Sequence, residues 1–393
     1  MTEYRHIGRN FVPPDVHGKV TGKAKYAEDF RADGMVYARV LTSPMAHGRV
    51  TGLDTSRAEA MEGVVGILTA DDLPLVEAPG APMLTNTPCY IGEPILAVAA
   101  LDEKTAEDAI ASIRVDIEPL PFAVDPLDSL VEGGPDAREE GNVYVRTREG
   151  SGFRTVKWTA EQVEALRQGK EPTGEAVSEW SYGDLAKGFA DAAVVIEEPF
   201  VTIGYAHMSM EPRTAMAYWQ NGKVYVYGSV QSQSFVIPGL ARLLEVEQED
   251  VVLVSENTGG GFGSKISAYP MMGLPAWFAK KLGRPVQLRI TREQEYYVGS
   301  ARIGFQGWIK VGFAADGRVT ATDLFIVEDI GPNAAGGDGS SAGGAVSIVY
   351  DPESMRFSRR PRAHQHHAAG GPTRPGTEPD RGHHGAHHGQ GGA

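Results

Sequence analysis

The chain has a single cysteine, Cys89, among its 393 residues. One cysteine excludes an internal disulfide. It also excludes an iron–sulfur cluster held by this chain alone, because such a cluster takes about four thiolates. If the protein carries out redox chemistry, its electrons must therefore leave through another polypeptide. A lone cysteine says little about nucleophilic chemistry, since its ordinary role is that of a small buried apolar residue.

Long apolar runs and positive charge are also scarce. No run approaches the ~18 apolar residues of a membrane span. The first residues, MTEYRHIGRNFVPPDV, lack the apolar segment of an export signal, so we expect a cytoplasmic protein. The net charge of −14 disfavours nucleic acid and anionic membranes as partners, because both bind basic surfaces.

The apolar pattern of the first part of the chain predicts a small α+β unit over residues 15–130. A capping box at Thr105-Ala-Glu-Asp108 begins a short helix within it. Residues 131–192 are polar and weakly periodic, and we expect an irregular connection with one helix near Ala160–Arg167. The strand-like segments of the unit are Val36–Val40, Val64–Thr69, Ile95–Ala99 and Ile113–Ile117.

Residues 193–357 predict a second α+β region. Asn221-Gly222 and Asp316-Gly317 each lie between two strand-like runs, and these dipeptides are strong signals for β-hairpins. Two segments with helical spacing, Ile237–Leu244 and Leu274–Leu282, surround a buried strand at Val251–Val254. That strand leads directly into a run of glycines.

The tail, residues 358–393, has a different composition. It contains no Val, Ile, Leu, Met, Phe, Trp, Tyr or Cys, and it cannot bury enough apolar surface to offset the entropy of ordering. We therefore expect residues 358–393 to be disordered. The histidine pairs at 366, 383 and 387 could bind nickel or zinc adventitiously, and we expect no functional metal site there.

The run Thr258-Gly-Gly-Gly-Phe-Gly-Ser-Lys265 is the most informative feature of the sequence. Consecutive glycines let the backbone approach a ligand closely, and at least one of them is expected at positive φ. The spacing differs from that of a Walker loop and of a dinucleotide fingerprint, which disfavours nucleotide hydrolysis. From its residues alone the loop is either an anion- or cofactor-binding loop or a tight turn without a ligand.

Several motifs, in one order along the chain, resemble the molybdenum-cofactor subunit of the xanthine dehydrogenase and aldehyde oxidase family. The glycine run is similar to the family's GGxFGxK loop. Gln231, 31 residues before Phe262, is similar to the glutamine of its S-T-Q segment. The other matches are Asp15-Val-His-Gly-Lys-Val-Thr-Gly22, Tyr90-Ile-Gly-Glu-Pro-Ile95 and Met210-Glu-Pro-Arg-Thr-Ala-Met-Ala217.

The resemblance implies a hammerhead domain at 15–130 and part of a first molybdopterin-binding domain at 193–357. It implies that Gly260, Gly261, Phe262 and Gly263 lie against the molybdopterin cofactor and that Gln231 hydrogen-bonds the apical oxo ligand of molybdenum. The implied reaction is oxidation of an aldehyde or N-heterocycle with oxygen from water. Electrons would pass to separate 2Fe–2S and FAD subunits.

Relatives in this family continue with a second cofactor-binding half and a catalytic glutamate, which this sequence lacks. The chain is therefore expected to be incomplete, with its activity alone in doubt. An alternative is a non-catalytic fragment that keeps partner-binding surfaces without molybdenum. Ile266 stands where some relatives have an acidic substrate-binding residue, which disfavours a purine-specific enzyme.

Three further residues have ordinary explanations that outweigh chemical ones. Ser264 has no candidate base nearby in the sequence and is expected to be a loop hydroxyl. Glu211 could be an acid–base residue, but the resemblance favours a structural role. His207, beside two methionines, is more often a core or surface histidine than a ligand.

Overall fold

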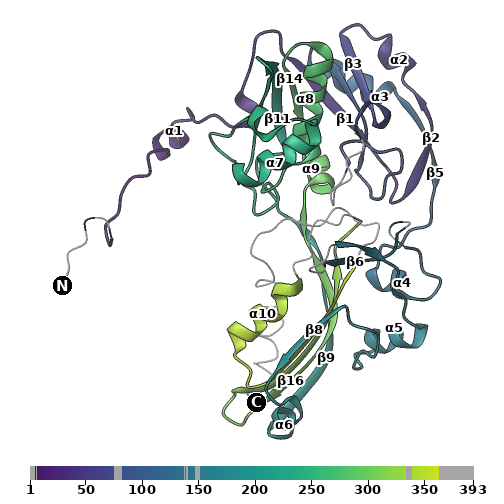
Figure 1. Cartoon of the computed structure of the whole chain (residues 1–393), viewed down its shortest axis with the longest axis vertical. Coiled ribbons are helices and arrows are strands. Elements are labelled where there is room, and N and C mark those ends of the chain that lie inside the picture. The colour runs from purple at the N-terminus through teal and green to yellow at the C-terminus, as the bar shows by residue number, and fades with distance from the viewer. Residues whose placement is uncertain are drawn as a thin grey trace.

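The computed structural model describes residues 5, 7–74, 82–136, 138, 140–146, 151–332 and 339–362. These residues form an upper and a lower body, each built on its own β-sheet, and an N-terminal arm that projects to one side (Figure 1). Within this part of the chain, no helix is both long and apolar enough to cross a membrane. The mixture of helices and sheets confirms the predicted α+β class.

A seven-stranded sheet forms the upper body, in the order β13-β12-β11-β14-β1-β4-β3. Its two faces differ in what covers them. Ala215 and Ala217 lie in the apolar core, whereas Tyr218 lies on the other face and stacks on Tyr225. The strands are β1 (Val36–Thr42), β3 (Val64–Thr69), β4 (Pro94–Ala100), β11 (Thr214–Gln220), β12 (Lys223–Gly228), β13 (Val251–Val254) and β14 (Val286–Arg289).

Two helices cover one face of this sheet, and a third lies on the opposite face. On the first face are α7 (Gln233–Leu244) and α8 (Pro270–Leu282), and α8 is tied to β11 by the Trp219 indole, which donates to Ala276 O at 2.8 Å. On the opposite face α3 (Glu103–Ser112) packs over β1 and β4. Smaller elements here are η1 (Ala27–Asp29), β2 (Gly48–Asp54), α2 (Ser56–Glu59), η2 (Ala70–Asp72), β5 (Arg114–Pro119), η3 (Gln248–Asp250) and α9 (Arg292–Val298).

The upper sheet joins the two regions that the sequence predicts as separate units. Strand β1 pairs in parallel with β14, with Val36 opposite Val286, and one apolar core contains buried residues of both regions. Residues of 15–130 and of 193–357 therefore share one sheet and one apolar core. The pairing joins segments far apart in the chain, and the pattern of a single strand does not say which strand it will pair with.

The lower body is built on a five-stranded sheet in the order β8-β18-β17-β16-β9. Both predicted hairpins are confirmed: Asn221 and Gly222 turn β11 into β12 with φ of +53° and +77°, and Gly317, at +88°, lies in the turn between β16 and β17. The strands are β8 (Ser178–Tyr182), β9 (Val194–Thr202), β16 (Gly304–Phe313), β17 (Val319–Asp329) and β18 (Met355–Arg362).

Residues 131–192 are more regular than the sequence predicts. The expected helix is present as α5 (Ala160–Arg167), but β8 also joins the lower sheet, where Trp180 packs against Phe357 of β18. Trp158 and Leu166 enter a core with Trp308. These aromatic anchors find their partners far along the chain, so local periodicity does not reveal them. Other elements of the lower body are α4 (Pro126–Leu130), β6 (Val143–Arg146), β7 (Ser151–Arg154), α6 (Leu185–Ala190), β10 (Tyr205–Ala206), β15 (Ala301–Arg302) and α10 (Gly339–Tyr350).

The expectation that residues 358–362 belong to a disordered tail is wrong, because β18 continues to Arg362. The strand pairs in parallel with β17 and antiparallel with β8. Backbone pairing needs no apolar side chain, and polar partners hold these residues: Ser358 donates to Glu179 at 2.8 Å, and Arg359 pairs with Glu328 at 3.1 Å. Residues 363–393, with the histidine pairs, lie outside the described residues.

The N-terminal arm, residues 7–24, makes little contact with the rest of the chain (Figure 1). Its only helix, α1 (Val16–Val20), has no buried residue. Four apolar side chains of the arm are 71 to 80 % exposed: Ile7, Phe11, Val12 and Val20. The arm joins the upper body at Lys25–Ala27, beside the glycine loop.

Candidate cofactor-binding site

The glycine loop, residues 258–265, lies between β13 and α8. Gly260 and Gly263 have φ of +99° and +93°, which confirms the prediction that at least one glycine of the loop has positive φ. Phe262 has φ of +51°, a conformation that non-glycine residues rarely adopt, and its side chain is 61 % exposed. Backbone in such rarely populated conformations clusters at ligand-binding sites.

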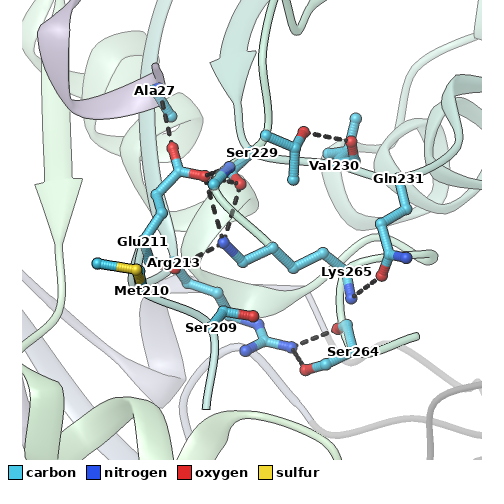
Figure 2. Close-up of polar contacts among 12 residues, drawn as sticks. Ala27, Ser209, Met210, Glu211, Arg213, Ser229, Val230, Gln231, Ser264 and Lys265 are labelled. Atoms are coloured by element: carbon cyan, nitrogen blue, oxygen red, sulfur yellow. Dashed lines mark hydrogen bonds and ion pairs between the residues drawn. The ribbon is translucent and has the colours of Figure 1, made fainter. Parts of the chain in front are cut away.

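Gln231, just after β12, is held by the loop (Figure 2). Its Oε1 accepts hydrogen bonds from Gly263 N at 2.9 Å and Lys265 N at 3.2 Å, and its own backbone N donates to Lys265 O at 2.9 Å. Backbone N–H groups can only donate, so the oxygen of the amide faces the loop. The NH₂ group of this exposed residue is left to donate to a ligand.

The loop has no room for side chains where it meets Gln231. A Cβ added at Gly261 would lie 2.3 Å from Gln231 Oε1, and one at Gly259 would lie 2.6 Å from the Cβ of Glu211. Real Cβ atoms do not approach that closely, so glycine at these positions is a packing requirement. The sequence predicts this loop as a close-approach site, and the geometry fits a group that lies against backbone amides.

Behind the loop, a buried carboxylate gathers donors from three parts of the chain (Figure 2). Glu211 Oε2 accepts Gly259 N at 2.7 Å and Ser229 Oγ at 2.5 Å, and Oε1 accepts Ala27 N at 3.1 Å. Lys265 Nζ, fully buried, donates to Glu211 O at 2.7 Å and Ser229 Oγ at 2.9 Å. Burial lowers the pKa of Lys265, although the nearby Glu211 carboxylate favours the charged form.

A second buried cluster supports the other end of the loop. The Arg213 guanidinium donates to the backbone and hydroxyl oxygens of Ser264 and pairs with Glu295, which also contacts His207 Nε2 at 2.9 Å. Burial alone would raise the pKa of Glu295. Arg213 and the hydrogen bond from His207 outweigh burial and hold that pKa below its usual value. His207 Nδ1 accepts from Ser209 N at 3.1 Å, which places the ring proton on Nε2.

The structure brings Gln231 together with Gly260, Gly261, Phe262 and Gly263, the residues that the sequence singles out. The sequence misses the roles of Arg213 and Glu295. These two residues are 82 positions apart. Arg213 directly precedes β11 and Glu295 lies in the short helix α9, and neither position carries a local signal that the two side chains will pair. The remaining expectations concern Ser264, Glu211 and His207. Glu211 belongs to the first buried cluster, and Ser264 and His207 belong to the second.

This arrangement offers a ligand the partly exposed backbone of Gly260, the amide donor of Gln231 and the exposed ring of Phe262. Among the described residues, no group of three or more His, Cys, Asp or Glu side chains is placed to hold a metal ion.

Comparisons with known proteins give the site a context. Residues 168–374 match the model of the molybdopterin cofactor-binding domain family, and residues 21–121 match the aldehyde oxidase and xanthine dehydrogenase a/b hammerhead domain. The chain is 29 % identical over 344 residues to a probable hypoxanthine oxidase XdhD of Escherichia coli O157:H7, covering 83 % of this chain and 36 % of that protein.

Two other similar proteins differ in how much of them is matched. The nicotinate dehydrogenase large molybdopterin subunit of Eubacterium barkeri is 28 % identical over 345 residues, which cover 85 % of this chain and 73 % of that subunit. The structure of the CO dehydrogenase from Oligotropha carboxidovorans aligns with a TM-score of 0.76 at 22 % identity, covering 93 % of this chain and 45 % of that one.

Proposed function

Because the chain belongs to the molybdopterin cofactor-binding family of xanthine dehydrogenases and aldehyde oxidases, we propose that it is the cofactor-binding part of a molybdenum hydroxylase. Its substrate class is an aldehyde or an aromatic N-heterocycle. The names of the relatives support that class, since hypoxanthine and nicotinate are both N-heterocycles. Relatives with the hammerhead and cofactor-binding regions are molybdenum oxidoreductases.

The observation that carries the proposal is the orientation of Gln231 against the glycine loop. With Oε1 held by Gly263 N and Lys265 N, the amide presents its NH₂ group to an oxygen acceptor beside the loop. A Cβ added at Gly261 would meet the Gln231 side chain, and one added at Gly260 would meet Phe262 and Ser209. When bound, the molybdopterin cofactor supplies the redox chemistry, and the chain supplies binding, orientation and hydrogen bonds.

Electron transfer requires partners in this proposal. Cys89 is the only cysteine, so an iron–sulfur centre must be held by another polypeptide. We propose a 2Fe–2S subunit and an FAD-binding subunit. The inclusion of subunits in the names of several relatives supports an assembly of this kind.

A second candidate is a protein that keeps partner-binding surfaces without molybdenum. The chain spans 36 % of the length of the hypoxanthine oxidase relative and 73 % of the nicotinate dehydrogenase subunit. The two candidates differ in one measurable quantity, the molybdenum bound per chain.

The test is elemental analysis of the chain purified from a host that makes molybdopterin. We expect about one molybdenum per chain for the wild type and none for Gly261→Val, because the branched side chain fills the space beside Gln231. Gly344→Ala is the matched control, since nothing lies within 4 Å of its added Cβ. A wild-type chain without molybdenum, purified with its partners, would favour the second candidate.

A further inference from the structure

We infer that Glu211 is a positioning residue that couples the N-terminal segment Lys25–Ala27 to the glycine loop. The order of the loop then depends on a segment at the opposite end of the chain. This inference rests on the proposed function only in so far as the loop binds the cofactor. The contact between the two segments stands independently of which ligand the loop takes.

The coupling runs through one carboxylate. Glu211 Oε1 accepts the N–H of Ala27, 184 residues away, and Oε2 accepts the N–H of Gly259, the first glycine of the loop. The side chain of Glu211 is only 8 % exposed, so both bonds are shielded from water. Ser229 Oγ also donates to Oε2, and Lys265 Nζ lies 3.4 Å from the same oxygen.

A second tether joins the same two segments. The Asn257 side-chain amide donates to Lys25 O at 3.0 Å, across 232 residues. On the other side, Glu211 N donates to Gly259 O at 3.2 Å. The start of the loop is therefore held between the N-terminal segment and the residue that leads into β11.

The chemistry of the contact requires a carboxylate. Ala27 N and Gly259 N are both donors, so each needs an oxygen from the residue at position 211. A glutamine there has nearly the same shape but only one acceptor oxygen, and its NH₂ group would face one of the two N–H donors. Glu211→Gln therefore keeps the packing of the site and breaks one link of the coupling.

The N-terminal arm leads directly into this contact. The arm itself has no buried residue, whereas the chain becomes buried at Ala27, where Glu211 accepts its amide. The coupling therefore belongs to Lys25–Ala27 and not to the arm that precedes it. Deletion of residues 2–20 leaves the tether intact, and deletion of residues 2–28 removes it.

The experiment is hydrogen–deuterium exchange of the purified full chain, followed in peptides that cover residues 25–30 and 255–265. For Glu211→Gln we expect exchange about tenfold faster in both peptides, with helix α8 unchanged. The control Glu247→Gln makes the same substitution on an exposed residue whose side chain caps nothing. Deletion of residues 2–20 should behave as the wild type does.

If Glu211→Gln does not fold, Asn257→Ala supplies the second test. This half-exposed residue makes the hydrogen bond to Lys25 O and does not contact the Glu211 carboxylate. It should speed exchange in the peptide that covers Ala27. Unchanged exchange of both peptides in the folded variants would overturn the coupling, even if the wild type binds molybdenum. If Glu211→Gln exchanges faster but the purified wild type holds no molybdenum, the result supports the coupling and counts against the proposed function alone.

Discussion

At the scale of single residues, the contact between Gly261 and Gln231 decides the shape of the site. Gly261→Ala would push a methyl group to 2.3 Å from Gln231 Oε1, so either the glutamine or the loop must move. We expect a loss of about 1–3 kcal/mol in the free energy of unfolding. The Gly263 and Lys265 amides, which bond Gln231, should exchange faster.

Urea denaturation and amide exchange measure these two effects. The matched control is Gly344→Ala in α10, where the added methyl meets nothing and alanine favours the helix. That variant should be as stable as the wild type or more so. Equal stability and exchange in Gly261→Ala and Gly344→Ala would show that the loop tolerates a side chain.

A buried carboxylate outside the site predicts how stability depends on pH. Glu93 is 3 % exposed, accepts a hydrogen bond from Cys89 N at 2.6 Å, and has its pKa raised to about 7 by burial. The folded chain thus binds this proton more tightly than the unfolded chain, whose carboxyl has a pKa near 4.5. The stabilising effect is complete below pH 4.5 and is lost as pH rises to 7.

Glu93→Gln removes that dependence, because its amide oxygen can still accept from Cys89 N without carrying a charge. We expect the variant to match the wild type near pH 4.5 and to exceed it at pH 8 by up to about 3 kcal/mol. Denaturation at several pH values measures the difference, with Glu247→Gln as the exposed control. A variant less stable than the wild type at pH 8 would contradict the prediction.

The sequence predicts the residues of the site better than it predicts their supports. The glycines and Gln231 stand in short motifs, so the sequence alone singles them out. Arg213, Glu295 and Lys265 support them through contacts between segments far apart in the chain. Those pairings depend on tertiary geometry, which no local pattern encodes.

At the scale of elements, hairpins and amphipathic helices follow from the sequence, whereas isolated sheet strands do not. The Asn-Gly and Asp-Gly turns and the helices α7 and α8 have local signals of their own. Strands β8 and β18 have no such local signal. They are defined by their contacts in the folded chain, where Trp180 and Phe357 pack on each other across the lower sheet. The last five residues of β18, 358–362, have the same polar and arginine-rich composition as the tail.

The end of β18 provides a test by truncation. A chain that stops after Arg362 should unfold at the same urea concentration as the whole chain. A chain that stops after Phe357 loses strand pairing and the Arg359 partner of Glu328, a fully buried carboxylate. Leaving such a charge unpaired costs about 3 kcal/mol or more.

Urea unfolding curves of the two truncated chains measure that cost. The chain that stops after Arg362 also serves as the control for loss of the last 31 residues. Identical midpoints for both truncations would mean that residues 358–362 contribute nothing to the lower sheet.

At the scale of the whole molecule, the upper sheet makes the first 130 residues dependent on residues far downstream. In a fragment of residues 15–130, strand β1 would lack its partner β14, and apolar side chains of the shared core would be uncovered. We expect the fragment to self-associate or to unfold without a cooperative transition, because an open apolar strand edge pairs with other chains.

Light scattering coupled to gel filtration, together with urea unfolding, examines the fragment beside the whole chain. The whole chain should give a cooperative transition under the same conditions. A monomeric 15–130 fragment that unfolds cooperatively would show that this region forms an independent unit after all.

The same pairing has a consequence for synthesis in the cell. Strand β1 leaves the ribosome about 250 residues ahead of the strand that covers its outer edge. At 5–20 residues per second, that edge waits for roughly 12 to 50 s, longer than the folding time of most small domains. During this interval the nascent chain exposes the unpaired backbone N–H and C=O groups of β1 to the other chains being translated from the same mRNA. The yield of folded protein should therefore depend on translation speed and on chaperones that bind nascent chains.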